Sequence, residues 1–302
     1  MKKRIRRSGF LWIFLAAVLA LAGCSRGETE KTASAKPEPE AVSSSSADIP
    51  AETPEPEKEK APVSAEPAEI PASTSEPAPE MTPEATPEPQ PTARGRMVAI
   101  DAGHQGQGNP EQEPVGPGAA ETKAKVSSGT SGSASGLNEY ELDLQVSLKL
   151  RDELAARGYQ VYMIRESNDV DISNRERAEL AAAAGADILV RIHANGSEDP
   201  SVAGALTMAP SVENPYVGSL APACQELSGD ILDAFCAATG AASQGVYITD
   251  TMSGINWSTI PVTIVEMGYM TNPEEDLRMA SEEYQQQMVQ GIANGIDVYF
   301  SE

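Results

Sequence analysis

The sequence predicts an α/β fold: a single domain with a largely parallel, twisted sheet flanked by helices, preceded by a disordered tether. The composition changes near residue 95, where a Pro-rich stretch ends. From residue 96 to 302, short apolar runs typical of buried strands alternate with longer segments of helical periodicity. Such alternation indicates β–α units around a parallel sheet, and about 200 residues are enough for one core.

Strands and helices can be assigned in order along this domain. Apolar runs predict strands over residues 97–100, 159–164, 187–192, 204–208 and 260–265. Helical spacing predicts helices over residues 142–154, 172–184, 224–238 and 282–300. Between His104 and Gly136 lies a Gly/Ser/Pro-rich stretch of about 30 residues, and loops of this length are usually functional or disordered. Because this stretch leaves the same strand end as His104, it could fold over a site there.

The N-terminus has the features of an export signal. Five basic residues within the first seven precede the apolar run 10–22, which is shorter than the roughly 20 residues that a membrane-spanning helix needs. The run ends in Leu21-Ala22-Gly23-Cys24, which resembles the lipobox of bacterial lipoproteins. We therefore expect residues 1–23 to be a signal peptide and Cys24 to carry lipid. An ordinary signal peptide with a chance cysteine and a marginal membrane anchor are the alternatives.

Residues 24–95 are predicted to form a disordered linker. The stretch from residue 26 holds 14 of the 23 prolines, 14 glutamates and no aromatic residue, so it cannot bury enough apolar surface to fold. Extended Pro-rich chain of about 70 residues could hold a domain up to about 200 Å from its lipid. A Pro-rich ligand for a partner domain is the alternative, but Pro-Glu repeats lack the usual basic flank.

Charge and cysteine content limit the partners and the redox chemistry. The formal net charge is −23, and removal of the signal leaves 17 basic against 45 acidic residues, or −28. So acidic a chain is repelled by phosphate backbones, which argues against nucleic-acid binding. Cys224 and Cys236 would lie about 18 Å apart on a continuous helix, too far for a disulfide. We interpret both as core residues, unless Gly229 breaks the helix.

Three chemically reactive side chains lie where predicted strands end. His104 and His193, the only histidines of the chain, and Glu266 each follow a separate apolar run. In open α/β sheets ligands bind beyond the carboxyl ends of the strands, so these residues should converge although they are distant in sequence. A lone histidine at a strand end is more often structural than a ligand, but two of two favour a metal site.

These residue types indicate a catalytic zinc site. Two imidazoles and a carboxylate leave one position of Zn²⁺ open for water, whose pKa the metal lowers. A further carboxylate that does not bind the metal can take the proton of that water and pass it to a leaving amine. Glu139 and Glu141, after the long stretch, and Glu266 are the carboxylates available, and spacing alone does not choose between the first two.

Four motifs in order resemble those of a known family. Ala99-Ile-Asp-Ala-Gly-His104, Leu137-Asn-Glu139, Arg191-Ile-His-Ala-Asn195 and Val265-Glu-Met-Gly-Tyr-Met-Thr-Asn272 are similar to motifs of the zinc-dependent N-acetylmuramoyl-L-alanine amidases of the Amidase_3 type. The resemblance covers about residues 97–300. It implies a peptidoglycan hydrolase that cleaves the amide between N-acetylmuramic acid and the L-alanine of the stem peptide. By position, it implies that His104, Glu139 and His193 bind zinc and that Glu266 is the catalytic carboxylate.

Four further residues could contact substrate: Arg175, Asn195, Trp257 and Asn272. Each has a structural alternative. Arg175 could form a surface salt bridge, Trp257 could pack in the core, and the two asparagines could be turn or packing residues.

Two other functions fit the same residues. A catalytically silent peptidoglycan-binding or regulatory lipoprotein could use the amidase scaffold as a receptor, although such a protein would be free to lose the four key side chains. A zinc deacetylase or peptidase acting on other wall polymers is the second. In each case we expect a monomer outside the cytoplasm, held to the cell membrane by its N-terminal lipid and facing the cell wall.

Overall fold

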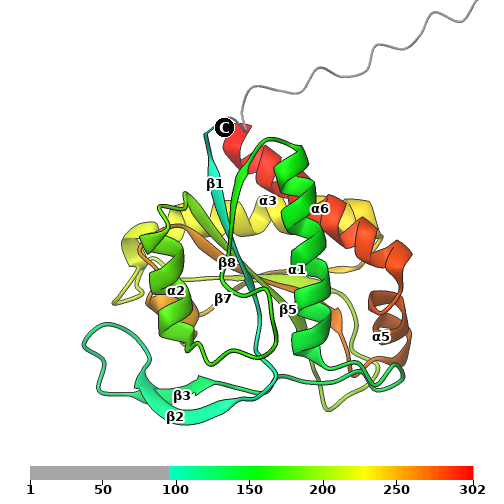
Figure 1. Ribbon diagram of the computed structural model, residues 1–302, viewed down its shortest axis with the longest axis horizontal. Helices are drawn as coiled ribbons and strands as arrows, with labels where there is room; N and C mark the ends of the chain where they lie inside the picture. The colour runs from blue at the N-terminus through cyan, green and yellow to red at the C-terminus, as the bar shows by residue number, and fades with distance from the viewer. Residues whose placement is uncertain (1–94, 302) are drawn as a thin grey trace, which may run out of the picture. The chain divides into compact units, whose positions relative to one another are not determined.

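A six-stranded sheet lies at the centre of residues 95–301, which the computed structural model describes (Figure 1). The expected signal peptide, Cys24 and nearly all of the expected linker lie outside these residues. The strands are β1 (Met97–Ala102), β4 (Gln160–Met163), β5 (Ile188–Asn195), β6 (Ala205–Ala209), β7 (Ser243–Ile248) and β8 (Val262–Tyr269). Their order is β4-β1-β5-β8-β6-β7, with β4, β1, β5 and β8 parallel and β6 antiparallel to β8. The prediction of a largely parallel sheet is confirmed.

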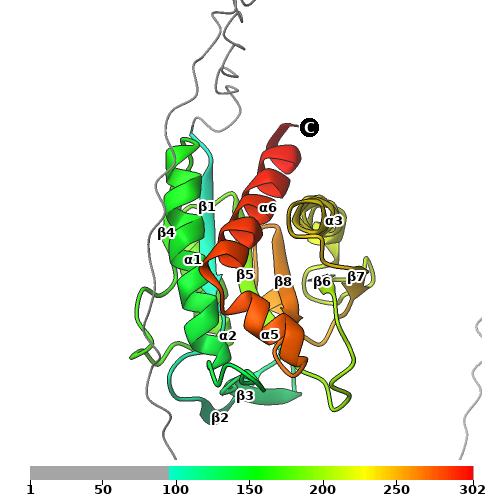
Figure 2. The ribbon, with the colours of Figure 1, turned by 90° about the vertical axis from the view of Figure 1, so that its right-hand side faces the viewer.

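Helices cover both faces of this sheet. One face carries α1 (Glu139–Ala156), α3 (Ala221–Thr239) and α6 (Glu282–Ser301), and Figure 2 looks onto it. The other face carries α2 (Asn174–Ala183) and the short α4 (Ser253–Asn256), while α5 (Pro273–Met279) connects β8 to α6. Successive side chains of a strand point to opposite faces, so each strand contributes to two cores. Val98 and Ile100 of β1 pack in the first, whereas Ala99 packs in the second.

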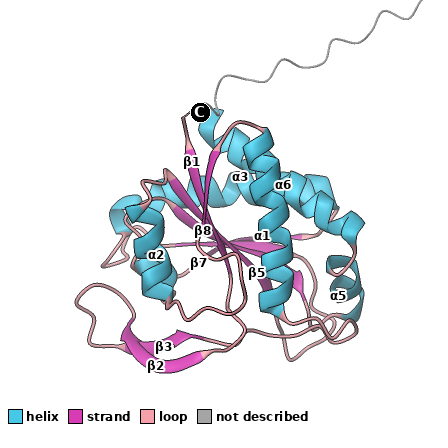
Figure 3. Cartoon of the chain, viewed as in Figure 1, coloured by secondary structure: helices cyan, strands magenta, loops and turns pink. Residues whose placement is uncertain are grey.

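The stretch between β1 and α1 is more ordered than the sequence indicated. It contains a two-stranded hairpin, β2 (Asn109–Pro114) and β3 (Thr122–Val126), drawn in magenta below the main sheet in Figure 3. β2 has the sequence NPEQEP and is largely exposed, so it lacks the apolar alternation by which strands are recognised. β7 and the short helices α4 and α5 were not predicted either, because none of them shows a clear apolar periodicity. The expectations that strands end at His193 and at Glu266 were wrong, because β5 continues to Asn195 and β8 continues to Tyr269.

The two cysteines of α3 are free. The helix is unbroken at Gly229, as its bounds show, and Cys224 is buried while Cys236 is partly buried. Burial raises the pKa of Cys224 to about 11, which makes its thiol unreactive. The interpretation of these residues as packing residues without a disulfide is confirmed. Among residues 95–301, no helix combines the length and apolar character needed to cross a membrane.

Two glycines of α6 allow it to lie directly against α3. A Cβ on Gly295 would overlap the Cα of Ile231, and one on Gly291 would lie 2.7 Å from the Cα of Phe235. Both neighbours are backbone atoms of a helix, which cannot move aside independently. By contrast, Gly229 on α3 has open space where its Cβ would be. Close packing of α3 on α6 therefore depends on Gly291 and Gly295 of α6, and not on Gly229.

We predict that Gly295→Ala destabilises the domain by about 1–3 kcal/mol, because the added methyl group forces the two helices apart. Gly229→Ala is the matched control, and it should stabilise the domain by about 0.5–1 kcal/mol through helix propensity. Urea unfolding of both variants measures the two free energies. An unchanged midpoint for Gly295→Ala would mean that α3 and α6 do not pack this closely.

Candidate metal centre and catalytic site

His104 follows β1 in a backbone conformation that residues other than glycine rarely adopt. Its φ is 52°, the one positive value among the non-glycine residues of 95–301. Gly103 before it has no side chain to obstruct the site, since a Cβ there would overlap the ring of His193. Unusual backbone conformations persist where the surroundings enforce them, and they concentrate at functional sites.

A hydrogen bond fixes the tautomer of His104. Its Nδ1 donates to the carbonyl oxygen of Ser127 at 2.9 Å, and a carbonyl oxygen can only accept. The proton of a neutral imidazole therefore lies on Nδ1, which leaves the lone pair of Nε2 facing Glu139 and His193. This is the arrangement in which metal-binding histidines are usually held.

Of the two glutamates at the start of α1, only Glu139 reaches the histidines. Its Oε2 accepts a hydrogen bond from the backbone N–H of Thr130 at 2.8 Å, which orients the carboxylate. Its Oε1 lies 2.9 Å from Nε2 of His104 and 3.2 Å from Nδ1 of His193. The carboxylate of Glu141 instead accepts from the backbone N–H of Asn138 at 3.1 Å and caps the helix.

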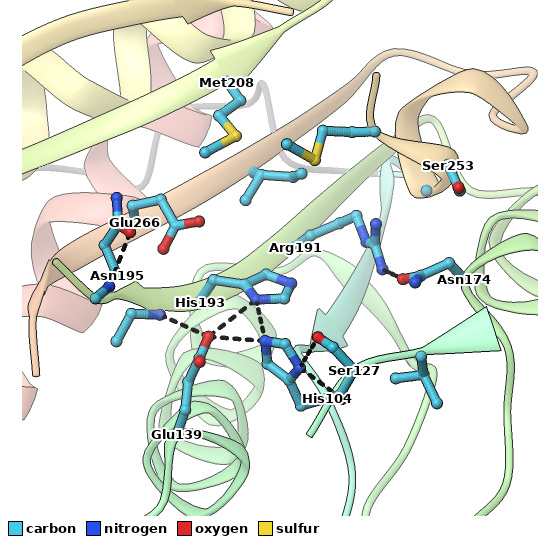
Figure 4. A pocket seen from close by; sticks show the side chains of 16 residues that line it. His104, Ser127, Glu139, Asn174, Arg191, His193, Asn195, Met208, Ser253 and Glu266 are labelled. Carbon is cyan, nitrogen blue, oxygen red and sulfur yellow. Dashed lines mark hydrogen bonds and ion pairs between the residues drawn. The ribbon is translucent and has the colours of Figure 1, made fainter. Parts of the chain in front are cut away.

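Three potential ligand atoms thus form a triangle (Figure 4). The third side, from Nδ1 of His193 to Nε2 of His104, is 3.1 Å. Ligand atoms around tetrahedral zinc, with bonds of about 2.0–2.2 Å, lie about 3.3–3.6 Å apart. Sides of 2.9–3.2 Å are close to that spacing. Two imidazole nitrogens and one carboxylate oxygen in this arrangement fit a zinc ion.

Glu266 faces the same site from the neighbouring strand. It pairs in register with His193, and both residues line a cavity of about 280 Å³. Its Oε2 is buried without a hydrogen-bond partner among the described residues. Burial, with the negative charge of Glu139 as a second cause, raises the pKa of Glu266 to about 8. A carboxyl group whose pKa lies near neutral pH is suited to taking up and returning a proton.

In the triad of His104, Glu139 and His193, the last two residues have the protonation that a metal ion requires. Burial lowers the pKa of His193 to about 4, so its imidazole is neutral at neutral pH. Burial opposes ionisation of Glu139, but the neighbouring side chains of His104 and His193 outweigh it and hold the pKa of that carboxyl below its usual range. Neutral imidazole and ionised carboxylate are the forms that bind metal ions.

Comparison with known proteins shows which family this chain belongs to. The family profile Amidase_3, described as N-acetylmuramoyl-L-alanine amidase, matches residues 98–298, about two thirds of the chain. The chain belongs to this family. The family is also the one that the four sequence motifs resemble.

Individual relatives of this Amidase_3 chain are moderately similar. YqiI, an uncharacterized protein of Bacillus subtilis (strain 168), is 30% identical over 208 residues, 69% of this chain and 86% of its own length. The N-acetylmuramoyl-L-alanine amidase Rv3717 of Mycobacterium tuberculosis is 28% identical over 208 residues, 67% of this chain and 85% of its own length. The crystal structure of the N-acetylmuramyl-L-alanine amidase Ami1 from Mycobacterium smegmatis has a TM-score of 0.63 at 26% identity, covering 69% of this chain and 98% of that one.

The four residues expected at the substrate groove of the amidase domain lie in different places. Asn195, at the end of β5, lines the cavity, and the other three are not among its lining residues. Arg175 forms an ion pair with Glu179 at 2.8 Å, and its guanidinium stacks 4.3 Å from the ring of Trp257. Asn272 caps α5 by accepting hydrogen bonds from two backbone N–H groups of that helix.

Asp143 lies at the candidate site but was not predicted from the sequence. It lies on α1 one turn after Glu139, is fully buried, and has no hydrogen-bond partner for either oxygen among residues 95–301. Its nearest carboxylate oxygen and the ligand atoms of His104, Glu139 and His193 all lie within 4.8 Å of one another. Burial and the charge of Glu139 raise its pKa well above the usual value. Its spacing of four residues from Glu139 places both on one helix face, a signal that could have found it.

A buried ion-pair network beneath the candidate site was not predicted either. Asp101 of β1 accepts from Nη1 of Arg177 and from Nε of Arg191, each at 2.7 Å. Burial opposes ionisation of Asp101, but the two guanidinium groups hold its pKa below the usual range. Arg177 also donates to the carbonyl oxygen of His104 at 2.8 Å, so α2 fixes the backbone that carries this potential ligand. On this helix the sequence indicated Arg175, whereas the buried arginine beside the site is Arg177.

Proposed function

We propose that this chain is an exported, zinc-dependent N-acetylmuramoyl-L-alanine amidase. It would hydrolyse the amide between N-acetylmuramic acid and the L-alanine of the peptidoglycan stem peptide. The observation that carries the proposal is the convergence of His104, Glu139 and His193 beside Glu266 in one cavity. Membership of the Amidase_3 family supports the choice of bond, and relatives such as Rv3717 bear the name of this activity.

Each side chain of the site has a role in this reaction. Zinc bound by His104, Glu139 and His193 would supply Lewis acidity, which polarises the lactyl carbonyl and lowers the pKa of the attacking water. Glu266 takes a proton from that water while the oxygen of the water forms a bond to the carbonyl carbon. Glu266 then returns the proton to the nitrogen as the C–N bond breaks, and the stem peptide leaves as an amine. The Ser127 carbonyl and the Thr130 N–H keep the first two ligands oriented throughout.

We predict that Glu139→Gln weakens zinc binding by at least about 100-fold, since even the loss of a group that only supports a ligand costs about 10- to 100-fold. Competition with a chromogenic chelator measures the dissociation constant. Glu141→Gln is the matched control, because it makes the same change two residues later on the same helix. Its affinity should stay within about twofold of the wild type. Equal weakening in both variants would point to damage of the helix rather than loss of a ligand.

We predict that Glu266→Gln lowers kcat by about 100- to 10,000-fold, because the proton carrier is lost while the three ligands remain. Zinc content, measured by plasma mass spectrometry, should equal that of the wild type. An active Glu266→Gln enzyme with full zinc content would disprove this role.

Mass spectrometry of digested peptidoglycan identifies the reaction of the wild type. Free stem peptides and peptide-free glycan indicate the amidase. Released acetate or cut peptides would indicate a deacetylase or peptidase, and zinc binding without any product would indicate a silent binding protein.

We further propose that the domain acts outside the cytoplasm on a lipid anchor. The support is the sequence of residues 1–95, namely the basic and apolar start, the lipobox-like Leu21-Ala22-Gly23-Cys24 and the Pro-Glu-rich linker. We predict that Cys24→Ser abolishes metabolic labelling of the protein with a fatty acid and moves it out of the membrane fraction. Persisting label in Cys24→Ser would reject the anchor.

A further inference from the structure

The cavity wall contains a guanidinium group to which the proposed reaction gives no task. Arg191 lies two residues before His193 on β5, so both side chains point to the same face of the sheet. It lines the cavity together with Asn174 and Gly254, and its side chain is only 4% exposed. Figure 4 shows His193 between Arg191 on one side and Glu139 and Glu266 on the other. The guanidinium therefore lies at the end of the cavity away from the carboxylates.

The group is held rigidly but is not fully used. Its Nε donates to Asp101 and its Nη2 donates to the side-chain oxygen of Asn174, both at 2.7 Å. No residue within 95–301 accepts a hydrogen bond from Nη1, and this nitrogen lies where a Cβ on Gly254 would be. Gly254 thus leaves room for the guanidinium in the wall. Hydrogen bonds from two of its nitrogens fix its orientation, and the third nitrogen, Nη1, is left to donate to a ligand.

Charge at this end of the cavity is unbalanced in the positive direction. Asp101 is shared between Arg191 and Arg177, so one carboxylate faces two guanidinium groups. Arg177 is fully buried away from the cavity, and its donors go to Asp101, to backbone oxygens and to Gln105. A buried charge without full compensation is costly, and an anionic ligand removes that cost. Guanidinium is the protein group best matched to a carboxylate.

We propose that Arg191 binds a carboxylate of the stem peptide and so makes the enzyme selective for an acidic residue near the scissile amide; this rests on the proposed function. Side chains two residues apart on a strand are separated by about 6–7 Å. An extended peptide covers that distance in about two residues. A carboxylate at Arg191 would therefore belong to the residue that follows the L-alanine when the scissile amide is at the triad. The glycan side of that amide offers neutral hydroxyl and acetamido groups instead.

A matched pair of substrates tests this role. Two N-acetylmuramoyl-L-alanyl peptides differ only in the α-substituent of the residue after alanine, a carboxylate in one and a carboxamide in the other. The wild type should favour the carboxylate by about 10- to 100-fold in kcat/KM, the range for a hydrogen bond to a charged group. Arg191→Gln should bring the ratio of the two kcat/KM values close to one.

Two further variants separate recognition from structure. Arg177→Gln removes the other partner of Asp101, so it should lower both kcat/KM values alike and keep their ratio. Gly254→Ala retains the charge but displaces the guanidinium, and it should reduce the ratio even if Arg191→Gln does not fold. Circular dichroism reports folding of each variant.

The outcomes distinguish this inference from the function on which it rests. If the wild type cleaves neither peptide nor whole peptidoglycan, the proposed function fails. If the wild type cleaves both peptides at equal kcat/KM, or if the preference survives in folded Arg191→Gln, the amidase stands and the role of Arg191 is overturned.

Discussion

Parallel pairing of β1, β5 and β8 is the constraint on which the site depends. The three strands point the same way, so their carboxyl ends meet at one edge of the sheet. Register then decides which side chains become neighbours, because Asp101 pairs with Arg191 and His193 pairs with Glu266. A shift of one residue would turn His193 and Arg191 to the opposite face, where α1, α3 and α6 form the core. The same pairing that buries the apolar residues therefore also assembles the chemistry.

Electrostatics divides the cavity into two ends. Near the triad, the carboxyl groups of Glu139, Asp143 and Glu266 gather in a largely buried space, where burial and mutual repulsion raise the pKa of the last two. A divalent cation would relieve this accumulation of carboxyl groups. At the other end, Arg191 and Arg177 exceed the single carboxylate of Asp101. One end thus suits a metal ion and a polarised carbonyl, and the other suits an anionic part of the substrate.

Much of the fold could be predicted because apolar periodicity is a local property. The runs that form β1, β5 and β8, and the helices α1, α2, α3 and α6, follow directly from it. The hairpin β2–β3 could not be predicted in this way, since its strands are polar and exposed and are joined mainly by backbone hydrogen bonds. For the site, strand ends indicated His104, His193 and Glu266. The buried residues Asp143 and Arg177 gave weaker signals, because charged residues on helices are usually on the surface.

The sequence by itself determined the fold class, the family resemblance and the two histidines, because each depends on residue order and on spacing along the chain. Spacing left Glu139 and Glu141 open, and the family resemblance implied Glu139. The tertiary structure adds that only Glu139 reaches the histidines, since the carboxylate of Glu141 caps the helix. It also separated Asn195, which lines the cavity, from Arg175, Trp257 and Asn272, whose partners lie elsewhere. The physical reason is common to these cases. Whether a side chain is buried, and which side chains it contacts, depends on residues that are distant in sequence. Those residues become neighbours only once the sheet has formed.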